Sequence, residues 1–121
     1  MEIVALGKTI KENPDDAFSY FRKGVALVRL CRYEEAIKLY DVAIELKPDY
    51  AEAYYIKGVA LDVLGKHREA IAAYDNAIKQ YPDYLDAYHN KGNELVRIGK
   101  YQEAIAAYDR VIELQPDNMG A

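Results

Sequence analysis

The sequence predicts an all-α protein built as a solenoid of stacked, antiparallel helix pairs. Three observations support this prediction: the prolines lie 34 residues apart, apolar residues recur at helical spacing, and only short turns separate the helical segments. The four prolines are Pro14, Pro48, Pro82 and Pro116, and each is followed by Asp. A fixed period of this length is typical of repeat proteins, in which each unit buries its apolar face against its neighbours.

Residues 51–84 form the clearest unit, and they predict two helices joined by a tight turn. The first helix should end near Gly65, because glycine accepts the left-handed conformation that closes many helices. The second should end before Pro82, because proline cannot continue a helix. A connection this short makes the two helices antiparallel neighbours. The apolar positions of the unit are Tyr54, Gly58, Leu61, Ala70, Ile71, Tyr74, Ala77 and Ile78.

Small side chains predict where the two helices of a unit touch. Gly58 costs about 1 kcal/mol in a helix interior relative to alanine, so a packing reason is expected for it. We expect Ala70 and Ala77 to allow a neighbouring helix to approach closely. The wider gaps around that contact should be filled by Tyr54, Leu61 and Tyr74.

Acidic residues at the repeat boundaries predict helix caps. Asp49 and Glu52 have the spacing of a capping box, and Asp83 stands at the matching place before the next unit.

The same pattern orders the whole chain. Residues 1–16 align with the second half of a unit and predict the second helix of an incomplete leading repeat. Three complete repeats follow at 17–50, 51–84 and 85–118, and residues 119–121 form a short tail. The chain should therefore be one solenoid domain.

Composition limits the partners and the compartment. Hydrophobic residues make up 51% of the chain, and the net charge of −4 comes from interspersed charges of both signs. Without a basic block, a nucleic acid is not an expected partner. The N-terminus has neither a signal-peptide pattern nor a membrane span, so membrane insertion is not expected. The single Cys31 fits a reducing compartment, and we expect a cytoplasmic protein.

The repeated residues resemble the tetratricopeptide repeat, whose pattern is W-x2-L-G-x2-Y, then A-x3-F, then P, on a 34-residue period. The second unit reads Tyr54-x2-Lys57-Gly58-x2-Leu61, then Ala70-x3-Tyr74, then Pro82, and the other two full units read alike. The resemblance implies a right-handed superhelix whose first helices line a concave groove. It also implies that the groove holds a peptide or a partner protein, with no catalytic activity and no cofactor.

Positions that face away from the partner helix define the expected groove. They are apolar with charged edges in the first two units and polar in the third. The expected groove residues are Phe18, Phe21, Arg22, Val25, Arg29, Tyr55, Ile56, Val59, Asp62, His89, Asn93 and Arg97. An alternative stays open, namely that Phe21 and Tyr55 mainly pack the repeats together.

Two specialisations of the family are not expected here. The carboxylate clamp of chaperone-binding members requires Lys, Asn and Arg at positions that here hold Phe21, Val25, Ile56, Asp86 and Asn90. An asparagine ladder, with one asparagine at the same position of each repeat, is not expected either, because the residues at that position are Arg22, Ile56 and Asn90.

Residues with metal-binding or catalytic chemistry are few. His67 stands where the sister units have Tyr33 and Tyr101, so we interpret it as a packing substitute. His89 has no second ligand at suitable spacing, and we expect no metal site. Cys31 replaces Gly65 and Gly99 and is expected to be an exposed turn residue.

The ends of the stack suggest a second function. Terminal repeats normally need a polar outer face, yet Leu6 at one end and Ile105, Ile112 and Leu114 at the other are aliphatic. These residues predict end-to-end self-association, and hence a possible homo-oligomer. The alternative is that they are singly exposed side chains, which surfaces tolerate.

Overall fold

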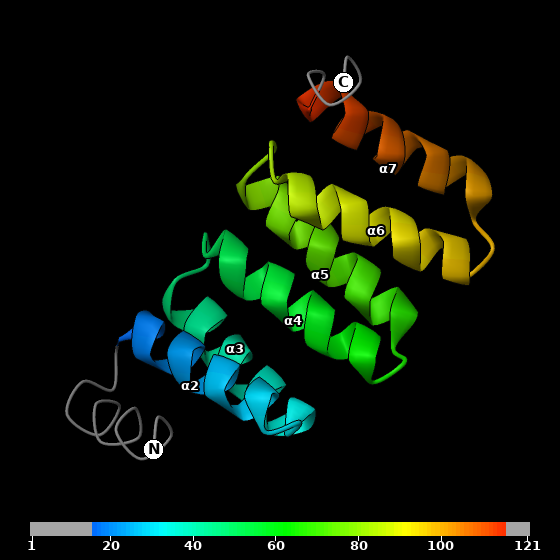
Figure 1. Cartoon of the computed structure of the whole chain (residues 1–121). Helices are drawn as coiled ribbons and strands as arrows, with labels where there is room; N and C mark the ends of the chain where they lie inside the picture. The colour runs from blue at the N-terminus through cyan, green and yellow to red at the C-terminus, as the bar shows by residue number, and fades with distance from the viewer. Residues whose placement is uncertain (1–15, 116–121) are drawn as a thin grey trace.

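The computed structural model describes residues 16–115, which form six α-helices in three antiparallel pairs (Figure 1). The helices are α2 (Ala17–Arg29), α3 (Tyr33–Leu46), α4 (Ala51–Val63), α5 (His67–Gln80), α6 (Leu85–Arg97) and α7 (Tyr101–Leu114). No strand occurs in this part of the chain. The predicted leading helix lies outside it, apart from Asp16, and so does the tail.

The pairs are stacked in chain order, so that each packs only on its neighbours. The two helices of a pair are in extensive contact, and successive pairs meet through α3 with α4 and α5 with α6. In Figure 1, α2, α4 and α6 run side by side in front, and α3 and α5 lie behind them. The predicted all-α solenoid of antiparallel pairs is therefore confirmed. None of the described helices has the length and apolarity that crossing a membrane requires.

A glycine facing a tyrosine ring sets the contact inside each pair. A β-carbon built on Gly58 would lie 2.5 Å from Cε1 of Tyr74, and those on Gly24 and Gly92 would meet the tyrosines of their own pairs at 2.5 and 2.6 Å. The expected packing reason for Gly58 is confirmed. Tyr74 does not fill a wider gap, as we predicted, because its ring lies directly against Gly58 at the close contact. Ala70 and Ala77 are fully buried, and their part in the close approach stays a prediction.

The turns inside the pairs need a left-handed residue. Gly65 has φ of 77° and Gly99 has φ of 80°, as the helix-ending role of glycine predicts. Cys31 occupies the same place with φ of 61°, where a β-carbon is sterically disfavoured. Its side chain is exposed, as expected.

The predicted caps at Asp49 and Asp83 were wrong. Tyr50 and Tyr84 hold the N-cap positions of α4 and α6, and neither cap makes a side-chain hydrogen bond. Tyr50 is buried, with its ring centroid 5.1 Å from that of Phe21, so packing places it at the helix start. Asp16 does cap α2, where its carboxylate accepts hydrogen bonds from Phe18 N at 3.1 Å and Ser19 Oγ at 2.8 Å.

Candidate functional site

The first helices of the three pairs, α2, α4 and α6, form a continuous surface that we call the first-helix face. Side chains 35 residues apart join α4 to α6 across it. Asn90 Nδ2 donates to Tyr55 Oη at 3.1 Å, and the Arg97 guanidinium pairs with the Asp62 carboxylate. These bonds fix the spacing of the two helices and occupy polar groups of the face.

Two aromatic residues of the expected groove, Phe21 and Tyr55, mostly serve packing. The ring of Phe21 lies 5.8 Å from that of Tyr40 and also contacts Tyr50. Tyr55 repeats this arrangement one unit later, against Tyr74 at 5.8 Å and Tyr84 at 5.1 Å. Burial raises the pKa of the Tyr55 phenol, and the nearby Asp86 carboxylate raises it further. Each aromatic side chain ties its own helix to a second helix and to the following turn.

The aliphatic residues of the expected groove are half-buried. Val25 and Ile56 pack against the core formed by Leu27, Ala36 and Tyr40, and Val59 packs against the next core along the stack. Each leaves part of its side chain on the first-helix face. They shape the floor of this surface, so replacing them would also weaken the core.

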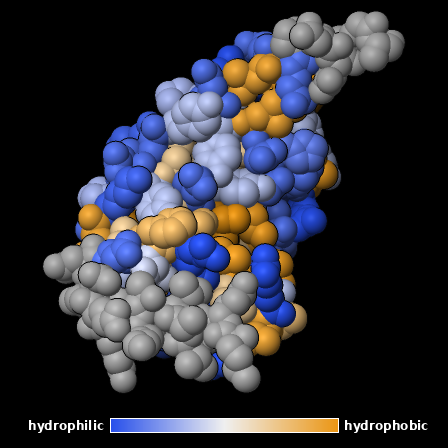
Figure 2. Space-filling model, turned by 60° about the vertical axis from the view of Figure 1, so that its left-hand side comes forward, coloured by the Kyte–Doolittle hydropathy of each residue, from blue (hydrophilic) through white to orange (hydrophobic). Residues whose placement is uncertain are grey.

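More exposed side chains stand around this floor. Phe18 is 55% exposed, and the Arg22 guanidinium carbon lies 5.6 Å from the centre of its ring. Arg29 is exposed at the last turn of α2, and Val63, at the end of α4, is 54% exposed. Figure 2 shows hydrophobic colour gathered toward the N-terminal end and again near the C-terminal end, with a more hydrophilic stretch between them.

The α6 part of the face is polar, as expected. Asn93 accepts a hydrogen bond from Tyr108 Oη at 2.6 Å, so its carboxamide oxygen is engaged in the packing of the last pair. His89 is exposed, and its ring stands edge-on to that of Tyr108.

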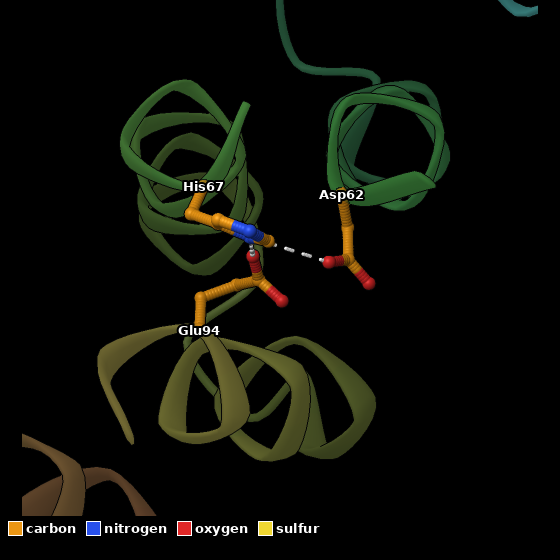
Figure 3. Close-up of side chains that lie close together, drawn as sticks. All are labelled: Asp62, His67 and Glu94. Carbon is orange, nitrogen blue, oxygen red and sulfur yellow. Dashed lines mark hydrogen bonds and ion pairs between the residues drawn. The ribbon is translucent and has the colours of Figure 1, made fainter. Parts of the chain in front are cut away.

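A cluster of ionisable side chains lies beside this face, where the second and third pairs meet (Figure 3). Asp62 comes from α4, His67 from the start of α5 and Glu94 from α6. His67 Nδ1 lies 2.6 Å from Glu94 Oε1 and 3.5 Å from Asp62 Oδ1. Arg97 completes the cluster through contacts with both carboxylates.

Our interpretation of His67 as a packing substitute was therefore incomplete, because its Nδ1 atom is hydrogen-bonded to Glu94 and lies close to the carboxylate of Asp62. Sequence reasoning missed Glu94 altogether. A signal was present in the repeat alignment, where Asp62, His67 and Glu94 stand at the places of Val28, Tyr33 and Ala60. At these three alignment positions, ionisable residues replace the apolar or aromatic residues found one repeat earlier. This change indicates that the junction between the second and third pairs differs from the one before it.

Glu94 has an unusual electrostatic setting, since only 1% of its surface is exposed. Burial raises the pKa of its carboxyl above the ordinary value. The hydrogen bond with His67 opposes that shift, the neighbouring Asp62 adds to it, and the Arg97 charge opposes it. The Glu94 carboxyl thus shares a small space with a second carboxyl group, that of Asp62, and with two basic side chains, His67 and Arg97.

At the C-terminal end, the outer side of α7 carries exposed apolar side chains. Tyr101, Ile105 and Ile112 are 62%, 55% and 45% exposed, and Leu114 is partly buried. In the second pair, the equivalent of Ile105 is Ile71, which packs against the core of the third pair. Leu6, the predicted counterpart at the other end, lies outside the described residues.

Comparison with known proteins agrees with the fold. A model of the tetratricopeptide repeat matches residues 5–51 and 21–85, and a second model of this repeat matches residues 85–118. Among curated proteins, none gives a significant match.

Several solved structures are similar over nearly the whole chain. A crystal structure of MamA superimposes with a TM-score of 0.92 at 28% identity, covering 98% of this chain and 70% of that one. MamA from Desulfovibrio magneticus RS-1 gives 0.86 at 24% identity, covering 95% and 65%. YrrB, described as "a TPR protein with an unusual peptide-binding site", gives 0.84 at 29% identity, covering 93% and 58%. The chain thus spans 58–70% of the length of these proteins.

Proposed function

The chain belongs to the tetratricopeptide repeat family, whose fold is a scaffold for protein–protein interaction, and we propose that its first-helix face holds an extended segment of a partner protein. The mechanism is equilibrium binding on a preformed surface, without a chemical step. Proteins of this family are generally not enzymes.

The observation that carries the proposal is the apolar floor on α2 and α4. The half-buried Val25, Ile56 and Val59 supply it, and the exposed Phe18 and Val63 stand at its two ends. Apolar surface of this kind gains about 25 cal/mol per Å² when a partner covers it. A rigid helical floor also costs little conformational entropy on binding.

Charge suggests which partner segment fits best. Arg22 and Arg29 are exposed on α2, next to the apolar floor. A segment with aliphatic or aromatic residues and a nearby carboxylate would match both features. On α6, by contrast, Asn90 and Asn93 already bond Tyr55 and Tyr108. We therefore propose that α2 and α4 make most of the contacts with the partner segment, and that His89 and Arg97 contribute less.

Similarity to YrrB adds support, because that protein is described as having a peptide-binding site. The identity is 29%, and this chain covers 58% of YrrB. The likeness favours a peptide ligand for this chain without indicating which residues bind it.

A display library of random peptides, selected on the wild-type chain, tests the proposal. Selected peptides should bind the double variant Phe18→Ser/Val63→Ser at least about tenfold more weakly, since each lost apolar contact is worth about 1–2 kcal/mol. Both side chains are more than half exposed, so the fold should persist. Fluorescence anisotropy measures the affinity and circular dichroism the helicity.

Leu30→Ser is the matched control, because Leu30 is 57% exposed but lies in the turn after α2. Equal affinity of the selected peptides for the double variant and the wild type would exclude this face. A simultaneous change of Phe21, Tyr55 and Val59 is a poorer test, because all three pack against the core.

Self-association through α7 is the second candidate function. The specific observation is that Tyr101, Ile105 and Ile112 are exposed, whereas the equivalent Ile71 and Ile37 are packed against the next pair. In the same set of samples, sedimentation of wild type and Ile112→Glu separates the two functions. A groove ligand should bind both proteins equally, whereas a dimer joined at α7 should dissociate in Ile112→Glu.

A further inference from the structure

We propose that Asp62, His67 and Glu94 form a binding site for a divalent transition metal, with Zn²⁺ as the best fit. One nitrogen and two oxygen ligands converge from three different helices (Figure 3). The three ligand atoms lie within 4.8 Å of one another. Asp62 directly precedes Val63, so the site borders the apolar floor of the first-helix face, but metal binding does not depend on the proposed peptide binding.

Departure from the repeat pattern is the first argument. The junction between the first two pairs has Val28, Tyr33 and Ala60 at the equivalent positions. That junction shows that the stack needs no polar group there. Burying a carboxylate such as Glu94 costs several kcal/mol of desolvation, and apolar packing is often at least as stable as a buried ion pair. Stability alone therefore does not account for the cluster.

Ligand geometry is the second argument. Zn²⁺ binds imidazole and carboxylate at about 2.0–2.2 Å, so tetrahedral ligand atoms are separated by roughly 3.3–3.5 Å. The distance of 3.5 Å between His67 Nδ1 and Asp62 Oδ1 meets that requirement. The distance of 2.6 Å from His67 Nδ1 to Glu94 Oε1 is that of a hydrogen bond, and it must open by somewhat less than 1 Å when a metal replaces the proton.

Ligand chemistry selects the class of metal. A neutral imidazole with two carboxylates balances the charge of a divalent cation and suits zinc and its neighbours in the first transition row. Ca²⁺ and Mg²⁺ prefer six or more oxygen ligands, which this cluster does not offer. With three protein ligands, the fourth position of a tetrahedral metal remains for water or for a group from a partner.

Arg97 is the built-in competitor of the metal. Its guanidinium pairs with Asp62 and lies 3.3 Å from Glu94 Oε2, so it supplies positive charge that a metal would replace. The Arg97 side chain is 51% exposed and can turn into water when a metal binds. Glu94 has no such freedom, because its side chain is 1% exposed. The metal and Arg97 should therefore exclude each other.

Calorimetric titration of the whole chain with Zn²⁺ tests the site, with Co²⁺ absorption as a report on coordination. The wild type should bind one ion per chain, and the His67 ring resonances should shift on titration. His67→Tyr should bind at least about tenfold more weakly. That variant installs the residue of the sister position Tyr33, so the fold should be kept, as circular dichroism would check. Arg97→Gln should bind more tightly than the wild type, because the competing cation is gone.

Two controls test for adventitious ligands: His89→Ala removes the chain's other histidine and Cys31→Ser its single thiol. Both variants should bind Zn²⁺ as the wild type does. The proposal is overturned if the wild type takes up no stoichiometric ion, if His67→Tyr retains full affinity, or if either control abolishes uptake. Weaker binding in Arg97→Gln would likewise contradict the assigned competition.

Discussion

At the scale of single residues, Tyr40 has the only buried side-chain polar atom without a hydrogen-bond partner in the described part of the chain. In the third pair, Tyr108 Oη at the equivalent position donates to Asn93. The residue corresponding to Asn93 in the first pair is Val25, which offers no acceptor. The tyrosine hydroxyl at this repeat position therefore has a hydrogen-bond partner in the third pair and none in the first, although both pairs share the same backbone fold.

This difference predicts opposite effects of one substitution. Tyr40→Phe should raise the free energy of unfolding by about 1 kcal/mol, because it removes an unpaired buried hydroxyl. Tyr108→Phe should lower it by about 1 kcal/mol, because it breaks a hydrogen bond with Asn93. Urea denaturation followed by circular dichroism measures both. Equal losses of stability in the two variants would mean that the Tyr40 hydroxyl has a partner, such as a bound water.

At the scale of the helix pair, the contact of glycine with tyrosine decides how closely the helices approach. In an exposed helix, a change from glycine to alanine such as Gly58→Ala would stabilise the helix by about 1 kcal/mol. Here the new methyl group would lie 2.5 Å from a ring carbon of Tyr74. We therefore expect Gly58→Ala to lower the free energy of unfolding by about 1–3 kcal/mol. Thermal denaturation of wild type and variant measures the change.

A second substitution checks the cause of that loss. In a double-mutant cycle, Gly58→Ala should cost less in a Tyr74→Leu background, because the flat ring that meets the methyl group is absent. A gain of stability in Gly58→Ala alone would show that the helices separate without cost.

The helices could be predicted from the sequence because the residues that end them act locally. Gly65 and Pro82 end helices through their own backbone preferences, and the 34-residue period repeats that information. The helix starts could not be placed to the residue. At the start of α4, burial of Tyr50 against Phe21 outweighs the capping preference of Asp49, and that contact joins α2 to the start of α4, 29 residues further along the chain.

The candidate sites show the same division between local and distant information. Helical spacing grouped the expected groove residues on one side of α2, α4 and α6, but it did not indicate that Phe21 and Tyr55 would stack on rings of neighbouring elements. His67 and Glu94 are 27 residues apart, and neither lies in a motif. Only the packing of α5 on α6 brings them together, so their contact had no signal in a single repeat.

At the scale of the whole molecule, the helices that the structure describes contact each other within a pair and between successive pairs. Lys57 and Lys91 each bridge to the preceding pair, through Asp41 and Asp75 at 2.6 Å. Buried tyrosines are distributed along the stack in the same way, with Tyr40 in the first pair and Tyr74 in the second. A change of conditions that acts on these tyrosines therefore acts on the first and the second pair at once.

Alkaline pH is such a condition. Burial raises the pKa of Tyr40, Tyr74 and Tyr84 well above the ordinary value of about 10. Their phenols stay neutral in the folded chain when they would already ionise in the unfolded chain. Stability should consequently be unaffected by these groups below about pH 10 and should fall as the pH rises further, by up to about 1.4 kcal/mol per pH unit for each tyrosine. Helicity, followed by circular dichroism, should disappear as these buried tyrosines ionise, which the late part of the rise in tyrosinate absorption reports. The transition should move to higher pH in Tyr40→Phe, which removes one of the ionising groups. Full helicity after all twelve tyrosines have ionised would show that these rings are not enclosed by the stack.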